Sequence, residues 1–288
     1  MTHPTETHPT ETQHTVAEPF TLTGVALRSG RPATAEVRPA DVDGGIQFLR
    51  GGVVIPAHVD HVVDTRLATT LGRGGVTVSM VEHLCAALHG AGIDNATVIV
   101  DGDELPVLDG SAWPWLERIQ ARDQSVPRRW RVVTEPVEVR SGASWARLEP
   151  ADRFELDVTI CFPHPAIGTQ RYRGPGSGTP FAQVLARART FGFLEDAERL
   201  RALGLARGAS LENTVVYDRV GVMNPGGLLA DDEAVRHKAV DAVGDAALLG
   251  GPLRGRLVAW CGGHTLHHHL FRTFLGGPPA RTGAAPLG

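Results

Sequence analysis

Short stretches with β-type alternation, each set followed by helical stretches, occur twice along the 288-residue chain. The first set lies near residues 20–126 and the second near residues 127–275, on either side of the polar, proline-containing segment DQSVPRRW. Strands followed by helices are typical of α+β domains, because a small sheet needs helices to cover its apolar face. We therefore predict an α+β protein with two similar halves, each with helices packed on a small β-sheet.

Both ends of the chain are predicted to lie outside these halves. Residues 1–19 contain a repeated THPTE unit with little apolar surface to bury, so a disordered tail is expected there. The glycine- and proline-rich residues 276–288 are predicted to be flexible. The sequence has no basic and apolar regions of a secretory signal at its start, and no apolar run reaches the roughly 18–20 residues of a membrane span. No stable membrane insertion is expected.

Charge and cysteine content narrow the environment and the partners. A net charge of −4 gives no strong attraction to nucleic acid, so none is expected as a partner. Three cysteines, none in a CxxC pair, do not suit a disulfide framework and favour a reducing cytoplasm. The chain also lacks the GxGxxG, GxxxxGK[ST] and GxSxG motifs, which argues against nucleotide-dependent phosphoryl transfer and serine-hydrolase chemistry.

The segment 230–251 is predicted to be a helix that carries three polar groups among alanines and valines. Side chains four residues apart share a helix face, so His237 and Asp241 point the same way and Asp245 follows one turn later. An imidazole and a carboxylate one turn apart can chelate one zinc ion. A solvated helix face is the alternative, but the apolar neighbours favour a buried stripe, and a buried stripe of this kind needs a partner.

A second candidate lies in SMVEHLCAALHG, which is predicted to be a helix with Ser79 as N-cap and Glu82 completing a capping box. Glu82 and His83 diverge by about 100° around a helix. One can therefore bind a metal while the other addresses a water beside it, the division of roles that zinc hydrolases need. The dipeptide alone is weak evidence, since such pairs occur by chance in most proteins.

Two further segments carry weaker signals. His264 follows the predicted strand GRLVAW within a GGH sequence, where glycines let a ligand approach the backbone, although a simple loop histidine is the alternative. His267, His268 and His269 look like a metal tract, but we expect them on the surface of the last helix. In RARTFGF, Thr190 could offer a hydroxyl to a transition-state oxygen, whereas spacing alone favours an amphipathic helix.

Taken together, these segments resemble the UDP-3-O-acyl-N-acetylglucosamine deacetylases, zinc amidases that commit Gram-negative bacteria to lipid A synthesis. The resemblance spans about residues 24–275, with its motifs in family order. The matching stretches are VEHLCAALHGAGIDNATVIVDGDELPVLDGSAWPW, HPAIGTQRY, ARARTFGFLEDAERLRALGLARGASLENTVVYD, DDEAVRHKAVDAVGDAALLGGPLRGRLVAW and GGHTLHHHL. This resemblance implies two similar halves with the active site between them, and an acyl-passage insert within the second half.

The resemblance also implies a catalytic set. His83, His237 and Asp241 match the zinc ligands of the family, so Zn²⁺ is the expected cofactor. Iron(II) suits the same donor set, and the sequence leaves open which metal the cell supplies. Glu82 matches the general base, and His264 matches the residue that stabilises the oxyanion and protonates the leaving amine.

Further positions match residues that support the catalytic set. Asp245 matches the carboxylate that orients His264, and Thr190 matches a hydroxyl that helps to hold the tetrahedral oxyanion. The expected substrate-binding residues are Lys238 near the diphosphate, Phe162 on the uracil, Phe191 and Phe193 at the acyl passage, and Arg28.

The implied reaction removes the N-acetyl group from UDP-3-O-(3-hydroxyacyl)-N-acetylglucosamine and gives acetate and UDP-3-O-acyl-glucosamine. The expected enzyme is a cytoplasmic, monomeric zinc metalloamidase with a small-molecule substrate. Two alternatives stay open. One is a related zinc amidase that acts on another N-acetyl sugar nucleotide, and the other is a non-enzymatic binding module, against which the complete hydrolytic set argues.

Three positions depart from the family pattern. Arg28 stands where the family has a histidine, and an arginine can still meet phosphate. Cys261 replaces a lysine and removes one cation near the nucleotide. Ala197 stands where many relatives carry a larger aliphatic residue, which suggests a roomier acyl passage.

Overall fold

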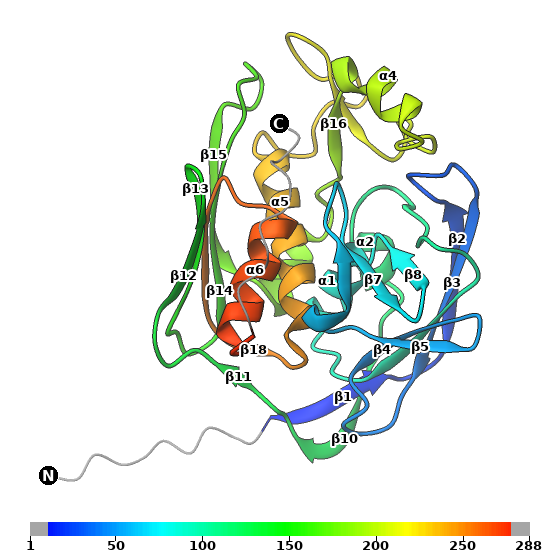
Figure 1. Ribbon diagram of the computed structural model, residues 1–288, viewed down its shortest axis with the longest axis vertical. Coiled ribbons are helices and arrows are strands. Elements are labelled where there is room, and N and C mark those ends of the chain that lie inside the picture. Colours follow the sequence, from blue (N-terminus) through cyan, green and yellow to red (C-terminus); the bar gives the residue numbers. More distant parts are fainter. Residues whose placement is uncertain (1–10, 278–288) are drawn as a thin grey trace, which may run out of the picture.

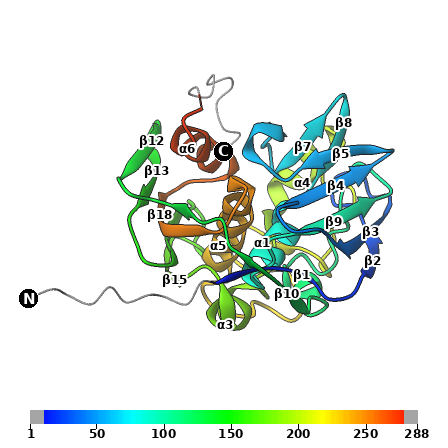
Figure 2. The same cartoon turned by 90° about the horizontal axis from the view of Figure 1, so that it is seen from below.

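Two β-sheets enclose a layer of helices in the computed structural model, which describes residues 11–277 (Figure 1). The strand order is β2-β3-β9-β4-β5 in the first sheet and β12-β13-β18-β14-β15 in the second, where β11 also pairs with β18. Seen from below, helices α1, α5 and α6 lie between the two sheets (Figure 2). The expected α+β architecture is confirmed.

The strands of the first sheet come from the first half of the chain. They are β2 (Phe20–Val25), β3 (Pro32–Pro39), β4 (Ile46–Arg50), β5 (Val53–Pro56) and β9 (Ala96–Val100). The helices of this half are the turn η1 (Val59–His61), α1 (Glu82–Gly90) and the short α2 (Trp113–Leu116). Alternating burial along β3 shows why this sequence forms a strand, since one face meets the core and the other faces out.

The strands of the second sheet come from the second half of the chain. Its strands are β11 (Arg131–Val132), β12 (Val137–Ser141), β13 (Ser144–Glu149), β14 (Phe154–Cys161), β15 (Thr169–Pro175) and β18 (Leu253–Trp260). Its helical elements are α3 (Gly178–Pro180), the π-helical turn η2 (Phe181–Leu185), α5 (Glu233–Ala246), η3 (Ala247–Leu249) and α6 (His264–Phe274). None of the helices within residues 11–277 combines the length and the apolar character needed to cross a membrane.

The two sheets share one topology. In the first, the β2–β3 hairpin joins β9 antiparallel through β3, and β4 pairs with β9 in parallel while β5 returns antiparallel to β4. In the second, β12, β13, β18, β14 and β15 repeat these relations in the same positions. A helix precedes the central strand each time, α1 before β9 and α5 before β18. The prediction of two similar halves is therefore correct.

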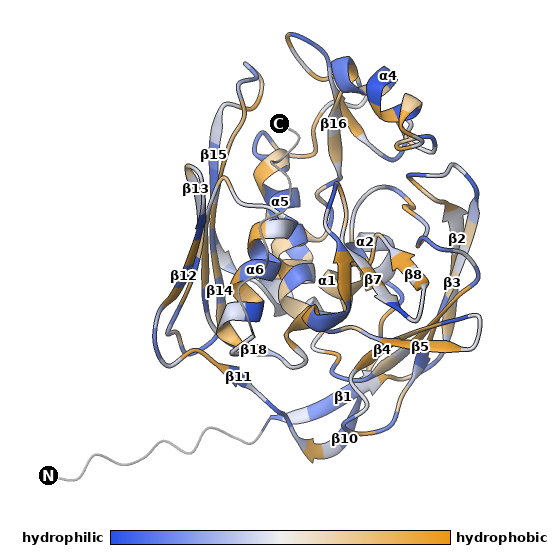
Figure 3. Cartoon of the chain, in the orientation of Figure 1, coloured by the Kyte–Doolittle hydropathy of each residue, from blue (hydrophilic) through white to orange (hydrophobic). Residues whose placement is uncertain are grey.

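Each half also carries an insert before its helix. In the first half the insert is a three-stranded sheet of β6 (Val62–Asp64), β7 (Thr70–Arg73) and β8 (Val76–Ser79). In the second half it comprises β16 (Phe191–Phe193), α4 (Leu194–Ala202) and β17 (Val215–Tyr217), with β16 and β17 parallel. Helix α4 stands at the top of Figure 1, has no buried residue and is largely hydrophilic in Figure 3.

The expected disordered tail is wrong for its last residues. Strand β1 (Thr12–Val16) pairs antiparallel with β10 (Ala121–Pro127), so β10 also replaces the predicted linker and crosses the proposed boundary at residues 126 and 127. Val16 is fully buried, and the amide of Gln13 donates to Asp43 at 2.8 Å. These contacts supply the apolar burial and polar pairing that the repeat unit lacks. Residues 1–10 and 278–288, where the remaining tails were expected, lie outside the described residues.

The prediction that RARTFGF belongs to an amphipathic helix is wrong. The chain leaves η2 after Leu185 and enters strand β16 at Phe191, so Thr190 lies in the connection between them rather than on a helix. Two anchors hold this segment. The backbone N–H of Thr190 donates to the carbonyl of Gly110 at 2.7 Å, and the guanidinium of Arg189 pairs with Glu233 at 2.8 Å. Tertiary contacts thus override the helical spacing of this segment.

Helices α1 and α5 approach closely at Gly244. A Cβ atom at that position would overlap the carbonyl oxygen of Glu82, which is the first residue of α1. Only the missing side chain lets α5 pack at this distance, and interiors that are this densely packed do not absorb an added methyl group. The close approach brings the first turn of α1 against the turns of α5 that carry Asp241 and Asp245.

We expect Gly244→Ala to destabilise the fold by about 1–3 kcal/mol, the usual cost of overpacking, and to push the two helices apart. Thermal unfolding of the purified variant measures the loss. Ala242→Gly, at another buried position on the same helix, is the control for helix propensity and should cost about 1 kcal/mol. An unchanged melting temperature for Gly244→Ala would contradict the packing argument.

The Arg189–Glu233 pair should make stability depend on pH. Burial raises the pKa of Glu233, but Arg189 and the backbone N–H groups of Leu229 and Arg189 outweigh it and lower that pKa below its ordinary 4.5. The stabilisation is therefore complete above pH 4.5 and is lost as pH falls through the lowered pKa. Removing the carboxylate in Glu233→Ala should cost about 3–5 kcal/mol at pH 7.

Denaturant unfolding at pH 7 and at acidic pH tests this prediction. The difference between wild type and Glu233→Ala should shrink as the solution becomes more acidic, because the wild type loses the same charge. Arg199→Ala, which breaks an exposed pair with Asp196, serves as the control and should cost at most about 1 kcal/mol. A difference that grows with acidity would contradict the assigned sign.

Candidate active site

Three helices bring their polar side chains together between the two sheets. Helix α1 contributes the pair Glu82 and His83 at its start, and α5 contributes His237, Asp241 and Asp245 on successive turns. His264 is the first residue of α6. All six of these side chains are buried, so the sequence-predicted stripe on α5 faces the interior and the solvated-face alternative is wrong.

The side chains of His83, His237 and Asp241 converge on one point. Nε2 of His83 lies 3.7 Å from Oδ1 of Asp241, and Nε2 of His237 lies 3.4 Å from the same oxygen. The two imidazole rings stand nearly perpendicular, with centroids 5.0 Å apart. One ligand atom from each of the three residues lies within 4.8 Å of the others, which is the spacing that a shared metal ion requires.

The chemistry of these three groups suits a divalent cation. Burial, followed by the neighbouring His237, lowers the pKa of His83 to about 3, so its imidazole is neutral. Nδ1–H of His237 donates to the carbonyl of Ala188 at 3.0 Å, which leaves Nε2 free to bind a metal. Burial raises the pKa of Asp241, but Lys238 and the nearby imidazoles outweigh it, so Asp241 is an anion. Two neutral imidazoles and one carboxylate result.

Glu82 lies beside this cluster rather than in it. Its Oε2 atom accepts the backbone N–H of Thr69 at 3.0 Å. Burial raises the pKa of Glu82 to about 7, Asp241 adds to the rise and His264 opposes it. The expected capping box is wrong, because Val81 precedes the helix without a side-chain cap and the Ser79 hydroxyl bonds to Thr70 at 2.8 Å. Glu82 is therefore free for acid–base chemistry near neutral pH.

His264 is held by Asp245. Nδ1 of His264 lies 2.9 Å and 3.0 Å from the two carboxylate oxygens of Asp245, and its Nε2 lies 3.9 Å from Oδ2 of Asp241. Burial lowers the pKa of His264, but Asp245 and Asp241 outweigh it and raise the pKa to about 9. A protonated imidazole at neutral pH can donate a proton toward the metal-ligand cluster.

The aromatic residues expected to bind substrate gather next to His237. The ring centroid of Phe162 lies 5.5 Å from that of Phe191 and 5.7 Å from that of Phe193. Phe191 lies 6.3 Å from the His237 ring, and Nζ of Lys238 lies 5.6 Å from the Phe191 centroid. The structure thus joins an apolar wall and a cation to the metal-ligand cluster. Burial lowers and Asp241 raises the pKa of Lys238, with a net rise, so this cation persists.

Thr190 and Arg28 lie at the edges of this arrangement. Thr190 stands between Ala188, whose carbonyl binds His237, and Phe191. Arg28 lies on the β2–β3 turn, where its Nη1 donates to the Ser79 hydroxyl at 3.3 Å and its backbone N–H donates to Glu104 at 2.7 Å. No described contact joins the Arg28 side chain directly to the metal-ligand cluster.

Sequence reasoning missed three residues of the site. Thr69 contacts both Glu82 and Asp245, and nothing in its sequence context marks it. His267 and His268 were expected on the surface, but they are 2 % and 0 % exposed and both contact Asp245. Their signal was the spacing, because residues three and four positions after His264 share its helix face. The surface expectation is wrong for these two histidines, and His269 is half-buried.

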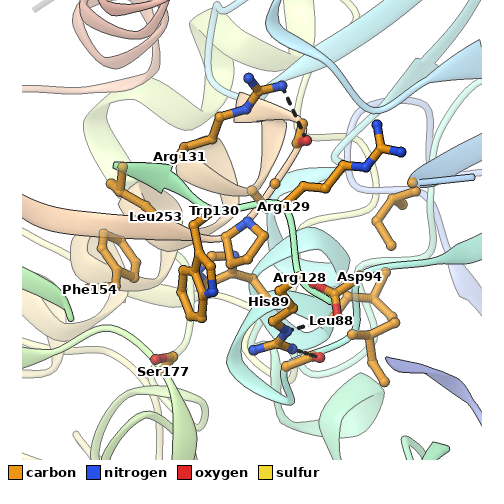
Figure 4. A pocket seen from close by; sticks show the side chains of 18 of the residues that line it. Leu88, His89, Asp94, Arg128, Arg129, Trp130, Arg131, Phe154, Ser177 and Leu253 are labelled. Carbon is orange, nitrogen blue, oxygen red and sulfur yellow. Dashed lines mark hydrogen bonds and ion pairs between the residues drawn. The ribbon is translucent and has the colours of Figure 1, made fainter. Parts of the chain in front are cut away.

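A cavity of about 1110 Å³ lies away from these residues, at the opposite end of α1 (Figure 4). Leu88 and His89 from the end of α1, together with Arg128, Trp130 and Phe154, are among its lining residues. None of the six buried residues that α1, α5 and α6 bring together lines this cavity. The chemistry of the side chains, rather than cavity size, therefore locates the candidate active site between α1, α5 and α6.

Comparison with known proteins agrees with this geometry. A family model described as LpxC, UDP-3-O-acyl N-acetylglycosamine deacetylase, matches residues 13–276. The UDP-3-O-acyl-N-acetylglucosamine deacetylase of Anaeromyxobacter dehalogenans is 49% identical over 273 residues, which cover 93% of this chain and 89% of that protein. Proteins of the same name from Myxococcus xanthus (47% identical, 92% and 87% covered) and Phenylobacterium zucineum (46% identical, 93% and 94% covered) are similar. The chain belongs to the UDP-3-O-acyl N-acetylglycosamine deacetylase family.

Proposed function

We propose that this chain removes the N-acetyl group from UDP-3-O-(3-hydroxyacyl)-N-acetylglucosamine. The products are acetate and UDP-3-O-acyl-glucosamine, and the reaction is the committed step of lipid A synthesis. The observation that carries the proposal is the convergence of His83, His237 and Asp241 beside Glu82 and the His264–Asp245 pair, in a chain of this family. A monomer in the cytoplasm is part of the same proposal.

Zn²⁺ is the proposed cofactor, held by His83, His237 and Asp241. The supporting observation is the donor set, since two neutral imidazoles and a carboxylate suit zinc. Zinc bound there supplies Lewis acidity, which lowers the pKa of water and polarises an amide carbonyl. Lys238 donates to Oδ2 of Asp241 at 2.9 Å and so orients the carboxylate with Oδ1 toward the two histidines.

The protein side chains supply the proton transfers. Glu82 takes the proton of the attacking water, because its pKa of about 7 suits a base at neutral pH. His264, protonated because its pKa is about 9, stabilises the negative charge that develops on the amide oxygen and then gives its proton to the leaving nitrogen. Asp245 keeps the Nδ1 side of His264 occupied so that Nε2 faces the reaction.

The remaining residues of the proposal bind the substrate. Thr190 offers its hydroxyl to the oxyanion, and Lys238 meets the diphosphate with Arg28 as a second cation. Phe162 stacks on the uracil. Phe191 and Phe193 begin the passage for the acyl chain, where each methylene that is buried contributes roughly 0.8 kcal/mol. The insert of β16, α4 and β17 carries this passage.

Removing the carboxylate of Glu82 should abolish most of the turnover without removing the metal. We expect Glu82→Gln to lower kcat by about 10²–10⁴-fold, since the amide cannot accept the proton of water. Metal content by atomic emission should stay at the wild-type level, because Glu82 is not a proposed ligand. Near-normal turnover in Glu82→Gln would rule out the assigned role. Glu104 is a buried carboxylate that accepts the backbone N–H of Arg28. The variant Glu104→Gln is therefore the control that measures the cost of losing a buried charge elsewhere.

Metal removal tests the ligand assignment. A chelator should abolish deacetylation of UDP-3-O-(3-hydroxyacyl)-N-acetylglucosamine, and added Zn²⁺ should restore it in the wild type. In Asp241→Ala we expect little bound metal and no recovery at that zinc concentration, because one of three ligands is missing. Chelator-resistant turnover would contradict the metal requirement. Parallel assays on UDP-N-acetylglucosamine without the acyl chain show whether the acyl group is required, and faster turnover there would favour another sugar nucleotide as substrate.

A further inference from the structure

The carboxylate of Asp245 is fully buried and is surrounded by more donors than an orienting carboxylate needs. Oδ1 lies 2.7 Å from the Thr69 hydroxyl and 3.0 Å from Nε2 of His268. Oδ2 lies 2.9 Å from Nδ1 of His264 and 2.9 Å from Nδ1 of His267. Nδ1 of His264 also lies 3.0 Å from Oδ1, so four donor groups surround the two oxygens and fill the acceptor capacity of a carboxylate. His267 and His268 have no part in the mechanism given above.

The surroundings fix which nitrogens of these two histidines carry protons. An ionised carboxylate only accepts hydrogen bonds, so His267 must present Nδ1–H to Asp245. The Thr69 hydroxyl donates to Asp245, so its oxygen accepts Nε2–H of His268 at 3.0 Å, and this Nε2 also lies 3.0 Å from Oδ1 of Asp245. The opposite atoms, Nε2 of His267 and Nδ1 of His268, are buried without a partner among the described residues. A proton on either would leave a buried N–H group unpaired, which is costly. Each imidazole therefore carries its proton on the nitrogen that donates.

Donors of this kind hold the carboxylate in place. His267 and His268 fix the two oxygens of Asp245 in space, while the negative charge remains available to His264. The rings are in turn packed by Phe271, whose centroid lies 6.4 Å from that of His267 and 6.3 Å from that of His268. Spacing of three and four residues after His264 on α6 puts all three imidazoles on the Asp245 side of one helix.

We propose that His267 and His268 are positioning residues for deacetylation, an inference that rests on the proposed function. They lock the Asp245 carboxylate so that His264 keeps Nδ1–H on Asp245 and keeps Nε2 directed toward the metal-ligand cluster. Without them, Asp245 can rotate away from His264 or draw water into its place. His264 would then spend part of its time in orientations that cannot donate a proton to the leaving nitrogen.

Paired substitutions separate donation from packing. His267→Asn and His268→Gln keep an N–H close to the position of Nδ1 and Nε2, whereas His267→Leu and His268→Met keep bulk but lose the donor. We expect the donor-free variants to lower kcat by about 10–100-fold, as loss of outer partners does at metal sites, with KM and bound metal unchanged. The donor-keeping variants should recover most of that loss. His269→Met on the same helix is the control, because its side chain has no described contact with Asp245, and it should keep wild-type kcat.

Kinetics decides between positioning and a merely structural role. Wild-type kcat in folded His267→Leu and His268→Met would overturn the proposal. An equal loss in the donor-keeping and donor-free variants, in step with their melting temperatures, would also overturn it, since a structural role predicts that pattern.

Nitrogen-15 NMR of the wild type tests the same point without any activity measurement. We expect protonated Nδ1 in His267, protonated Nε2 in His268 and unprotonated opposite nitrogens at pH 7, and the reverse tautomers would overturn the proposal even if the variants fail to fold. In His268→Met, the His264 Nδ1–H resonance should shift or broaden. If the wild type shows these tautomers but does not deacetylate the substrate, the proposed function fails while the hydrogen-bond arrangement stands.

Discussion

The close approach of α5 to the first turn of α1 is the contact on which the site depends. Gly244 lies against the carbonyl of Glu82, so the two helices are as near as their backbones allow. The histidine and carboxylates of α5 therefore reach the pair on α1 without long flexible side chains. A site assembled from short side chains on rigid helices loses little conformational freedom when it binds, which favours a fixed geometry.

That geometry concentrates charge in a place with little water. Three carboxylates and several imidazoles are buried together, and each ionised group needs a partner because solvation is lost. Asp241 pairs with Lys238 and Asp245 pairs with His264, whereas Glu82 accepts the backbone N–H of Thr69 and forms no ion pair among residues 11–277. Glu82 is accordingly the carboxylate whose pKa rises toward neutrality, while those of Asp241 and Asp245 fall. Unequal pairing therefore produces one base and two anions from three chemically similar groups.

The sequence predicted the two-half α+β architecture because alternation and helical spacing are local signals. It also identified the α5 stripe, since four-residue spacing among alanines and valines already implies a polar group facing the interior. It failed where distant contacts decide the structure. The Arg189–Glu233 pair draws residues near Thr190 out of a helix, and Thr70 takes the hydroxyl of Ser79 that a capping box would use. The spacing of His267 and His268 after His264 places them on one helix face, but their burial depends on Asp245, which lies on another helix.

The repeated topology shows which parts of the site come from equivalent elements of the two halves and which part does not. Helices α1 and α5 occupy the same position in their halves, each before a central strand, so the metal-ligand cluster forms where the two equivalent helices face each other. His264 has a different origin, because α6 follows the central strand β18, whereas β9 is followed by a loop and the short α2. Cys261 turns the chain between β18 and α6 with a left-handed φ of 48°, an unusual conformation for a residue with a side chain. The proposed acid thus comes from the part of the second half that the first half does not repeat, and this asymmetry gives each face of the cluster a different chemical role.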